Sequence, residues 1–406
     1  ALSLPLDPIE LRVIMTPPPE DINRLASGLQ SVLERPGVHV VKNAIQGSTA
    51  SEYPGTISEE FLHITQPEAI DTTSIPPFIT SSRDKHLLKA AKEARSSFMG
   101  STSSTTGLLS QIIQLLLAHR PRDMTSFSNE FETLPKNFTQ ATRKPTTVIM
   151  RRRGKVLGID NLPRYNPPSN QILIELGKSL ERMFTMEPQT FRDIMIKSSR
   201  KRVAIKQLAS EPSMCVKMNS LMVRAQLDCQ HENAQMAGVF DLKTRAVLPI
   251  RLDCQNHRRY TGYHITSFNG LLYSFEREFF DMVRSTMLKF SLQARIGQMA
   301  GIMVAYHNTQ RIFGFEYVSQ ESMDEHLFGS TAGGKFLFNT ATKLLDMSLT
   351  EVFLDPPPFS YDQARVTVHS PKGSKYCDIF VEYLPESAYA DHEDPLIRAH
   401  YAPYGV

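Results

Sequence analysis

The sequence predicts an α/β fold with a mixed central sheet flanked by helices, preceded by a helical and loop-rich N-terminal region. The main observation is the order of patterns from residue 170 onward, where a helix, strands, a long helix and further strands follow one another. The composition agrees, because 41% of the 406 residues are hydrophobic and 21% are charged, as in folded domains. A chain of this length can bury a large core and hold two or three domains.

The first 145 residues are expected to form an extended arm followed by helices and loops. Residues 1–20 are proline-rich and include Pro17, Pro18 and Pro19, which favours an extended conformation. Residues 21–145 are expected to pack on the core, with helices where apolar residues recur at helical spacing: 21–35, 83–96 and 108–118. The intervening stretches are rich in proline and polar residues and are expected to be loops.

Residues 146–385 carry the densest pattern and are expected to form the main domain, with 386–406 as a tail. One hairpin is predicted around the basic turn at residues 151–154, and another over residues 301–318. Further strands are predicted over 221–229, 238–252 and 376–383, and helices over 170–185, 275–298 and 334–348. Residues 186–215 are basic and irregular, which indicates an insertion.

Charge, cysteine content and hydropathy exclude several classes of protein. The net charge of +3 excludes a histone-like polycation but leaves room for a local basic groove. The four cysteines form no CxxC pair, so zinc ribbons and disulfide scaffolds are not expected and a reducing compartment fits. No apolar run reaches the length of a membrane span. No signal peptide is visible, and because the sequence begins at an alanine a targeting segment could precede it.

Two neighbouring strands carry the residue types of a metal-dependent phosphodiesterase. Strand side chains alternate between the two faces of a sheet. Asp228 therefore shares a face of its strand with Arg224 and Gln226, and Asp241 shares a face of the next strand with Lys243. A short connection between the two strands would bring Asp228, Asp241 and Lys243 into one cluster.

Glu181 adds a third carboxylate from the predicted helix over 170–185. It lies one turn after Gly177, and a glycine at that point would let the helix approach the sheet closely. Carboxylates suit Mg²⁺, which prefers oxygen ligands and is held by one or two carboxylates together with substrate phosphate. Such an ion lowers the pKa of an attacking water, and a lysine can orient that water.

Each of these residues also has an ordinary interpretation. Most Asp-x-Lys pairs on strands are surface charges, and Glu181 could pair with Lys178 or Arg182 on an exposed helix face. The order of the elements favours the catalytic interpretation. A helix with Glu, a strand with Asp, a strand with Asp-x-Lys and then a long helix is the arrangement of the PD-(D/E)XK nuclease superfamily.

Several stretches resemble a fungal mitochondrial protein family required for maturation of mitochondrial mRNA 5′ ends. The resemblance spans roughly residues 25–385 and is carried by "RPGVHVV", "GSTSSTTGLLS", "LGKSLERMFTM", "LMVRAQLDC" and "FDLKTRAVLPIR". It implies a PD-(D/E)XK nuclease-like core with Glu181, Asp228, Asp241 and Lys243 in the active site. It also implies that Asp228, Asp241 and Glu181 hold Mg²⁺, or Mn²⁺ in its place. Leu227 stands where the superfamily's namesake proline is found, and that proline is structural.

The superfamily has a fifth active-site position on the helix after the Asp-x-Lys strand. The resemblance assigns it to Lys289, in the stretch "LKFSLQ". Arg284 and Gln293 on nearby turns are alternatives, and an ordinary solvated helix charge is an equally acceptable interpretation of Lys289.

The hydroxyl-rich stretch 100–107 immediately precedes an apolar helical pattern. A helix N-terminus presents free N–H groups and the positive end of the helix dipole, which suits phosphate. Ser101, Thr102 and Ser103 are therefore predicted to bind a terminal 5′-phosphate, together with Arg83 as the nearby arginine. The alternatives are an ordinary N-cap, which uses one or two hydroxyls, and a flexible serine linker.

Basic residues cluster at 143–155, 197–206 and 245–259, and each cluster could be a solvated face. Aromatic residues interleave the third cluster, and bases stack on aromatic rings while phosphates bind cations. The predicted RNA-binding residues are Arg245, Arg258, Arg259 and Tyr260.

The leading functional prediction is a Mg²⁺-dependent ribonuclease that processes and degrades the 5′ ends of mitochondrial RNA, working as a 5′→3′ exoribonuclease. The location implied by the resemblance is the mitochondrial matrix, with peripheral association with the inner membrane as an option. The alternative is a catalytically weak RNA-binding or scaffolding factor that docks on the mitochondrial RNA polymerase or on RNA-decay machinery, for which residues 1–20 and the acidic tail 386–394 would serve. A DNA nuclease is a third option, because the same residues would serve it.

Overall fold

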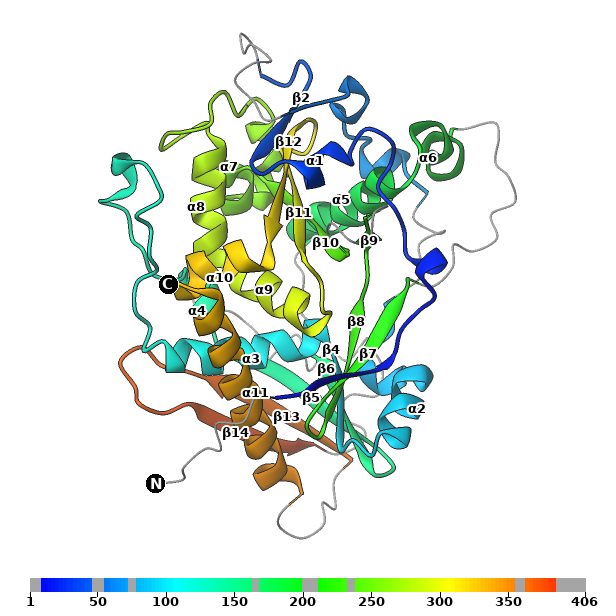
Figure 1. Cartoon of the computed structure of the whole chain (residues 1–406), viewed down its shortest axis with the longest axis vertical. Coiled ribbons are helices and arrows are strands. Elements are labelled where there is room, and N and C mark those ends of the chain that lie inside the picture. The colour runs from blue at the N-terminus through cyan, green and yellow to red at the C-terminus, as the bar shows by residue number, and fades with distance from the viewer. Residues whose placement is uncertain are drawn as a thin grey trace.

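Two mixed β-sheets form the framework of the protein (Figure 1). The computed structural model describes residues 9–45, 55–71, 78–162, 168–198, 211–231, 238–354 and 362–384. In these segments one sheet has eight strands in the order β1-β7-β8-β4-β6-β5-β13-β14, and the other has six in the order β3-β2-β12-β11-β10-β9. The predicted α/β class with mixed sheets and flanking helices is confirmed, although there are two sheets and not one central sheet.

The eight-stranded sheet occupies the lower half of Figure 1 and has parallel strands only around β4. Helix α2 (Lys85–Glu93) packs on one face, where it buries Met99 and Met222, while α3 (Thr102–Leu116) and α11 (Thr331–Phe353) lie on the other. The strands are β1 (Leu11–Met15), β4 (Phe98–Ser101), β5 (Thr146–Arg153), β6 (Val156–Asn161), β7 (Ser213–Met218), β8 (Leu221–Gln226), β13 (Gln363–His369) and β14 (Asp378–Leu384).

The six-stranded sheet lies in the upper half of Figure 1 and is covered by helices. Its strand β11 is buried along its whole length, as expected for a central strand. The strands are β2 (Val38–Val41), β3 (Thr56–Ile57), β9 (Cys229–Gln230), β10 (Val239–Ala246), β11 (Gly301–His307) and β12 (Ile312–Ser319). The helices around it are α5 (Pro168–Thr185), α7 (Leu248–Leu252), α8 (Phe275–Ser285), α9 (Met287–Ile296) and α10 (Gln320–Phe328).

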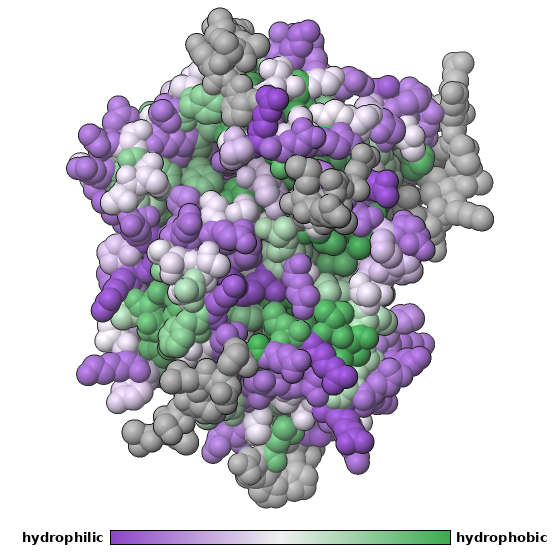
Figure 2. Space-filling view, in the orientation of Figure 1, coloured by the Kyte–Doolittle hydropathy of each residue, from purple (hydrophilic) through white to green (hydrophobic). Residues whose placement is uncertain are grey.

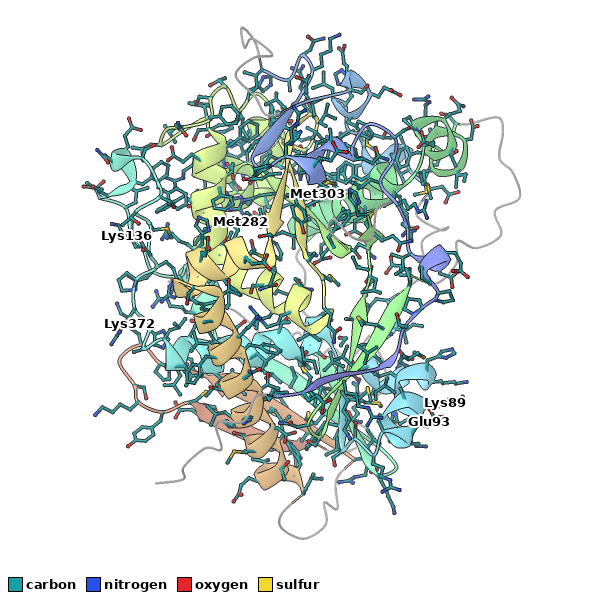
Figure 3. All side chains as sticks on the ribbon, viewed as in Figure 1. Lys89, Glu93, Lys136, Met282, Met303 and Lys372 are labelled. Atoms are coloured by element: carbon teal, nitrogen blue, oxygen red, sulfur yellow. The ribbon has the colours of Figure 1, made fainter. Side chains whose placement is uncertain are left out.

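The two sheets share one apolar core. A single cluster of buried residues includes Val223 of β8, Leu242 of β10 and Leu292 of α9. Figure 3 labels two other buried residues, Met282 of α8 and Met303 of β11, which lie in the interior of the upper half. The chain passes from one sheet to the other at residues 227 and 228, between β8 and β9. Residue 228 is therefore fixed at the junction of the sheets.

The surface is largely polar on the side shown in Figure 2. Hydrophilic residues dominate its rim, and apolar residues are visible toward the middle. Within the described segments, none of the helices combines the length and apolar character that a membrane span requires.

The shorter elements are α1 (Ser31–Glu34), α4 (Gln140–Arg143), α6 (Pro188–Met195) and the 3₁₀ turns η1 (Pro19–Asp21), η3 (Glu59–Phe61), η4 (Pro67–Ala69), η6 (Ser81–Arg83), η7 (Asn129–Phe131) and η8 (Cys254–Tyr260).

Most of the strongly periodic segments form the predicted elements. The helices expected over 83–96, 170–185 and 334–348 correspond to α2, α5 and α11. The two predicted hairpins are formed by β5 with β6 and by β11 with β12. The basic segment 186–215 contains α6 and the start of β7, with residues 199–210 outside the described residues. The tail 386–406 also lies outside them.

Three predicted elements are shorter or more interrupted than expected. The helix expected over 21–35 is only α1, because Gly28 adopts a φ of +92°, which interrupts a right-handed helix. The helix expected over 275–298 is broken into α8 and α9 at Thr286. The strand expected over 238–252 ends at Ala246, and α7 follows with Pro249 in its first turn, where no N–H is needed.

The expected division near residue 145 has no counterpart in the strand pairing. β1 and β4 belong to the eight-stranded sheet, and β2 and β3 belong to the six-stranded sheet. β4 lies between β6 and β8 and hydrogen-bonds to both. Residues before 146 therefore build both sheets and do not form a layer packed on a later core.

Candidate active site

One cavity brings together most of the residues predicted to carry the chemistry. It has a volume of about 320 Å³ and lies where β8, β10, α5, α9 and the start of α3 meet. Both the carboxylate cluster and the hydroxyls predicted to bind phosphate line it. The lining residues are Phe78, Ile79, Ser101, Thr102, Ser103, Lys178, Glu181, Glu211, Ser213, Arg224, Gln226, Asp228, Asp241, Lys243, Gln293 and Met299.

Asp228 is held at the junction of the two sheets. Its Oδ2 accepts a hydrogen bond from the backbone N–H of Leu242 on β10 at 3.0 Å, and its Oδ1 accepts one from Gln226 Nε2 at 3.1 Å. Burial, together with the neighbouring carboxylates of Asp241 and Glu181, raises the pKa of Asp228 well above its ordinary value. A cation bound beside Asp228 would oppose this effect.

Asp241 and Lys243 lie two residues apart on β10 and form an ion pair, as strand alternation predicts. Burial acts to raise the pKa of Asp241, but Lys243 and a hydrogen bond with Asp228 outweigh it and hold the pKa below the usual value. Burial acts to lower the pKa of Lys243, and the Asp241 and Asp228 carboxylates outweigh it and raise the pKa. The Lys243 ammonium also lies 5.4 Å from the centroid of the Phe290 ring of α9. Asp241 is thus ionised and Lys243 is protonated near neutral pH.

Glu181 faces the same cavity from α5. Burial, opposed by Lys243, raises the pKa of Glu181 to about 7. Gly177, one turn earlier, faces β10, where a Cβ atom would stand 3.6 Å from Thr244 Oγ1. That is an ordinary contact, so the helix approaches the strand as predicted but an alanine would also fit.

The oxygen ligands that the cavity offers suit a hard divalent cation. Asp228, Asp241 and Glu181 offer only oxygen atoms, which is what Mg²⁺ and Mn²⁺ prefer. Asp241 Oδ2 is buried and makes its ion pair with Lys243 without a hydrogen bond of standard geometry. Among the described residues, however, no three His, Cys, Asp or Glu side chains converge as a ready-made metal group.

The start of α3 also lines the cavity. The helix begins at Thr102 and not at residue 108, because Ser101 and Ser104 form a reciprocal capping box. The Ser104 N–H donates to Ser101 Oγ at 3.3 Å, and the Ser101 N–H donates to Ser104 Oγ at 3.0 Å. Ser103 Oγ accepts a hydrogen bond from Asn161 Nδ2 at 3.1 Å. Ser101, Thr102 and Ser103, at the N-terminus of α3, therefore line the same cavity as the carboxylates.

The cavity is lined by Arg224 and not by Arg83, the arginine predicted to lie there. Arg83 ends η6, is exposed and does not line the cavity. Arg224 on β8 lines it, forms an ion pair with Asp84 and donates from Nη2 to the carbonyl oxygen of Ile79 at 2.8 Å. The sequence contains a signal for this, because Arg224 shares a strand face with Asp228.

The cavity is lined by Gln293, one of the two alternatives to Lys289, whereas Lys289 acts on the site through its charge, which helps to lower the pKa of Asp241. Lys289 is exposed on α9 and does not line the cavity, whereas Gln293 lies one turn later and does. Arg284, the other alternative, donates from Nε to the carbonyl oxygen of Asn137 at 3.1 Å. Glu211 also lines the cavity and pairs with Arg182 at 3.5 Å. Glu211 was missed because it lies in a segment without periodicity.

The four predicted RNA-binding residues are not gathered at the cavity. Arg245 is 5% exposed and donates from Nε to the carbonyl oxygen of Glu278 at 2.9 Å, so its assignment as an RNA contact is wrong. Arg258 is exposed and pairs with Glu68 at 3.4 Å. Arg259 is exposed, and Tyr260 donates from its hydroxyl to Asp253 Oδ2 at 2.9 Å.

The chain matches the family model described as mitochondrial protein Pet127 over residues 78–350 and therefore belongs to that family. It is 37% identical over 276 residues to the mitochondrial mRNA degradation protein pet127 of Schizosaccharomyces pombe, covering 67% of this chain and 52% of that protein. It is 36% identical over 292 residues to PET127 of Saccharomyces cerevisiae, whose name links it to the mitochondrial translation system, covering 69% of this chain and 34% of that protein. The chain thus spans about half and a third of these relatives. The expected family is confirmed.

Solved structures with a partly similar arrangement include two proteins of very low sequence identity. Rai1 of Candida albicans, in complex with pU5 and Mn²⁺, has a TM-score of 0.44 and 11% identity, covering 95% of this chain and 94% of that chain. Dxo1 of K. lactis, in complex with manganese, has a TM-score of 0.41 and 9% identity, covering 92% and 85%.

Proposed function

We propose that this member of the Pet127 family is a metal-dependent ribonuclease that removes nucleotides from the 5′ ends of mitochondrial RNA. The observation that carries the proposal is one cavity lined by three carboxylates, a lysine and the N-terminus of α3. The name of the fission yeast relative, a mitochondrial mRNA degradation protein, supports the same substrate class. The mitochondrial names of both relatives support a mitochondrial location.

The charge of each cavity residue determines the role that we propose for it. Asp228 and Asp241 would hold Mg²⁺ or Mn²⁺, with Glu181 completing the set or accepting a proton from water. When bound, such an ion neutralises phosphate charge and makes water more acidic. Lys243 remains protonated because two aspartates face it, so it acts as a donor that orients the attacking water and not as a base.

The proposed direction of RNA degradation rests on the residues of α3 that line the cavity. Ser101, Thr102 and Ser103 present hydroxyls at a helix N-terminus, which favours a terminal phosphate. A phosphate bound there would leave the first phosphodiester of the RNA facing the carboxylates across the cavity. Hydrolysis would then release a nucleotide from the 5′ end, which is the 5′→3′ direction.

A second function is favoured by a specific observation. Lys243 contacts Asp241 directly, and no three acidic side chains among the described residues converge as a metal group. These features suit a protein that binds RNA ends without cutting them, as a scaffold for RNA-decay machinery or for the mitochondrial RNA polymerase. Peripheral contact with the inner membrane fits either function and stays a prediction.

The test is cleavage of the same RNA carrying a 5′-monophosphate, a 5′-triphosphate or a 5′-hydroxyl, in Mg²⁺, Mn²⁺ or chelator. We expect metal-dependent release of mononucleotide from a 5′ label, fastest for the monophosphate. RNA binding without cleavage in any metal would favour the scaffold. Equal cleavage of the three ends, or internal cuts throughout, would contradict the exonuclease direction.

A further inference from the structure

Two large apolar side chains stand exposed at the cavity. Phe78 is 59% exposed and Ile79 is 50% exposed, and both line the cavity that holds the carboxylates. The other walls carry mostly charged, amide and hydroxyl groups, so these two residues and Met299 are its apolar part. With a cation held by the carboxylates, such a cavity suits a ligand that has an anionic group and, close to it, a flat apolar surface.

The segment that carries Phe78 is anchored to the eight-stranded sheet. The Ile79 carbonyl oxygen accepts from Arg224 Nη2 at 2.8 Å, and the Ser82 N–H donates to Asp160 Oδ1 at 2.9 Å. Arg153 Nε donates to the Ser82 carbonyl oxygen at 2.9 Å. The backbone next to Phe78 is therefore held at the cavity by three side chains from three strands.

The fit of this segment against the sheet is also tight. A Cβ atom added to Gly158 of β6 would come within 2.9 Å of the Ser82 Cα, so only glycine allows this approach. The Phe78 ring itself lies 5.8 Å from the Arg224 guanidinium carbon, which is cation–π range. The backbone beside Phe78 is thus anchored while the ring itself stays largely exposed, so the position does not serve to bury the ring.

We propose that Phe78 is the platform on which a base at the 5′ end of the RNA stacks. The inference rests on the proposed function and adds a substrate-binding residue to it. The cavity holds a phosphate-binding helix N-terminus and an apolar ring together, as a nucleotide requires. Stacking on an aromatic ring tolerates every base, so this contact suits an enzyme that must accept any sequence at the end it degrades.

The absence of tryptophan from the chain gives a direct test. Phe78→Trp creates a protein with a single tryptophan at the proposed platform. Phe336→Trp is the matched control, because Phe336 is 56% exposed on α11 and does not line the cavity. Each variant is titrated in chelator with an unlabelled 5′-monophosphate RNA of six nucleotides, and tryptophan fluorescence is recorded. Binding is measured in parallel by anisotropy of the same RNA carrying a 3′ dye.

We expect RNA to quench the fluorescence of Phe78→Trp and to leave that of Phe336→Trp unchanged. Phe78→Ala should bind the RNA about tenfold more weakly, because one base–aromatic stack contributes 1–3 kcal/mol, whereas Phe78→Tyr should bind as the parent does. Anisotropy that reports binding while Phe78→Trp fluorescence stays constant would overturn the platform and leave the proposed function standing. Equal binding by Phe78→Ala would do the same. A parent protein that binds the RNA neither in chelator nor in Ca²⁺ would overturn both, because the proposed function needs a cation at the carboxylates.

Discussion

Arg245 illustrates how neighbours distant in sequence decide the role of a single residue. It lies in a basic stretch beside aromatic residues, yet its guanidinium is buried against Glu278 of α8, which also pairs with Arg251 at 2.6 Å. Burial lowers the pKa of Arg245 to about 9. The ion pair therefore joins β10 to α8 and is part of the structure, not of an RNA surface.

Arg245→Met should accordingly reduce stability and not RNA affinity. Removing one partner of a buried ion pair typically costs about 3–5 kcal/mol, and Arg251 remains to compensate Glu278 in part, so we expect about 3 kcal/mol or less. Urea unfolding measures this, with the exposed Arg259→Met as the control. Unchanged unfolding together with weaker RNA binding would return Arg245 to the RNA surface.

A second prediction for a single residue is that Glu316 makes the free energy of unfolding depend on pH. This carboxyl on β12 accepts a hydrogen bond from the Tyr306 hydroxyl at 2.5 Å, and burial raises its pKa to about 7. Because the folded-state pKa lies above the unfolded-state value of about 4.5, the unfolded state loses this proton first as pH rises. Glu316 therefore costs stability progressively between those two pH values, and the cost is fully present above pH 7.

Glu316→Gln should remove this dependence while keeping an acceptor for Tyr306. The free energy of unfolding of the parent relative to the variant should fall between pH 5 and pH 8, by up to about 3 kcal/mol. Glu93→Gln, at an exposed position of α2 near the edge of Figure 3, is the control. Parallel pH profiles of parent and Glu316→Gln would show that Glu316 is ionised in the folded protein at all these pH values.

At the scale of elements, the N-terminus of α3 has two roles that can be tested separately, the observed helix capping and the proposed phosphate binding. Ser101 closes the capping box, so Ser101→Ala should cost about 1 kcal/mol of stability. Ser103 is not the cap, and Ser103→Ala should cost less stability but slow cleavage of 5′-monophosphate RNA relative to 5′-hydroxyl RNA. Thermal unfolding and the two cleavage rates measure both effects. Ser103→Ala acting equally on the two RNAs would remove the phosphate role from α3.

The elements also explain what could be predicted from the sequence. Asp228, Asp241 and Lys243 lie on strands with clear alternation, so their meeting followed from local pattern and a short connection. Glu181 followed from the periodicity of α5. Lys289 was chosen instead of Gln293 because the resemblance aligned the stretch "LKFSLQ" at Lys289. Both residues lie on α9 one turn apart, so the helical pattern alone could not decide between them.

The features that the sequence did not predict depend on contacts between segments far apart in the chain. Arg224 was not considered as a phosphate contact, because its place beside Ser101 depends on β4 pairing with β8, which joins segments more than a hundred residues apart. The division near residue 145 was expected from a change in pattern density, but the strands before it have short and ordinary sequences. Their place in the sheets is set by partners that come much later in the chain.

At the scale of the whole molecule, the salt dependence of RNA binding should locate the groove. Lys178 lines the cavity, whereas Arg258 and Arg259 do not. For single strands each phosphate contact contributes about −0.7 to the slope of log K against log salt. Lys178→Ala should therefore make the slope shallower by about 0.7, and the double replacement of Arg258 and Arg259 by alanine should leave it unchanged. The reverse pattern would move the groove to η8.

The central claim is that the acidic residues at the junction of the two sheets support hydrolysis of RNA. Single-turnover cleavage of 5′-monophosphate RNA in Mg²⁺ by the parent and by Asp241→Asn tests it most directly. Asparagine keeps the shape but not the charge that would hold the cation and that pairs with Lys243. We expect the parent to release mononucleotides and Asp241→Asn to bind the RNA with similar affinity while cleaving at least a hundredfold more slowly. Cleavage by Asp241→Asn at the parent rate would contradict the account.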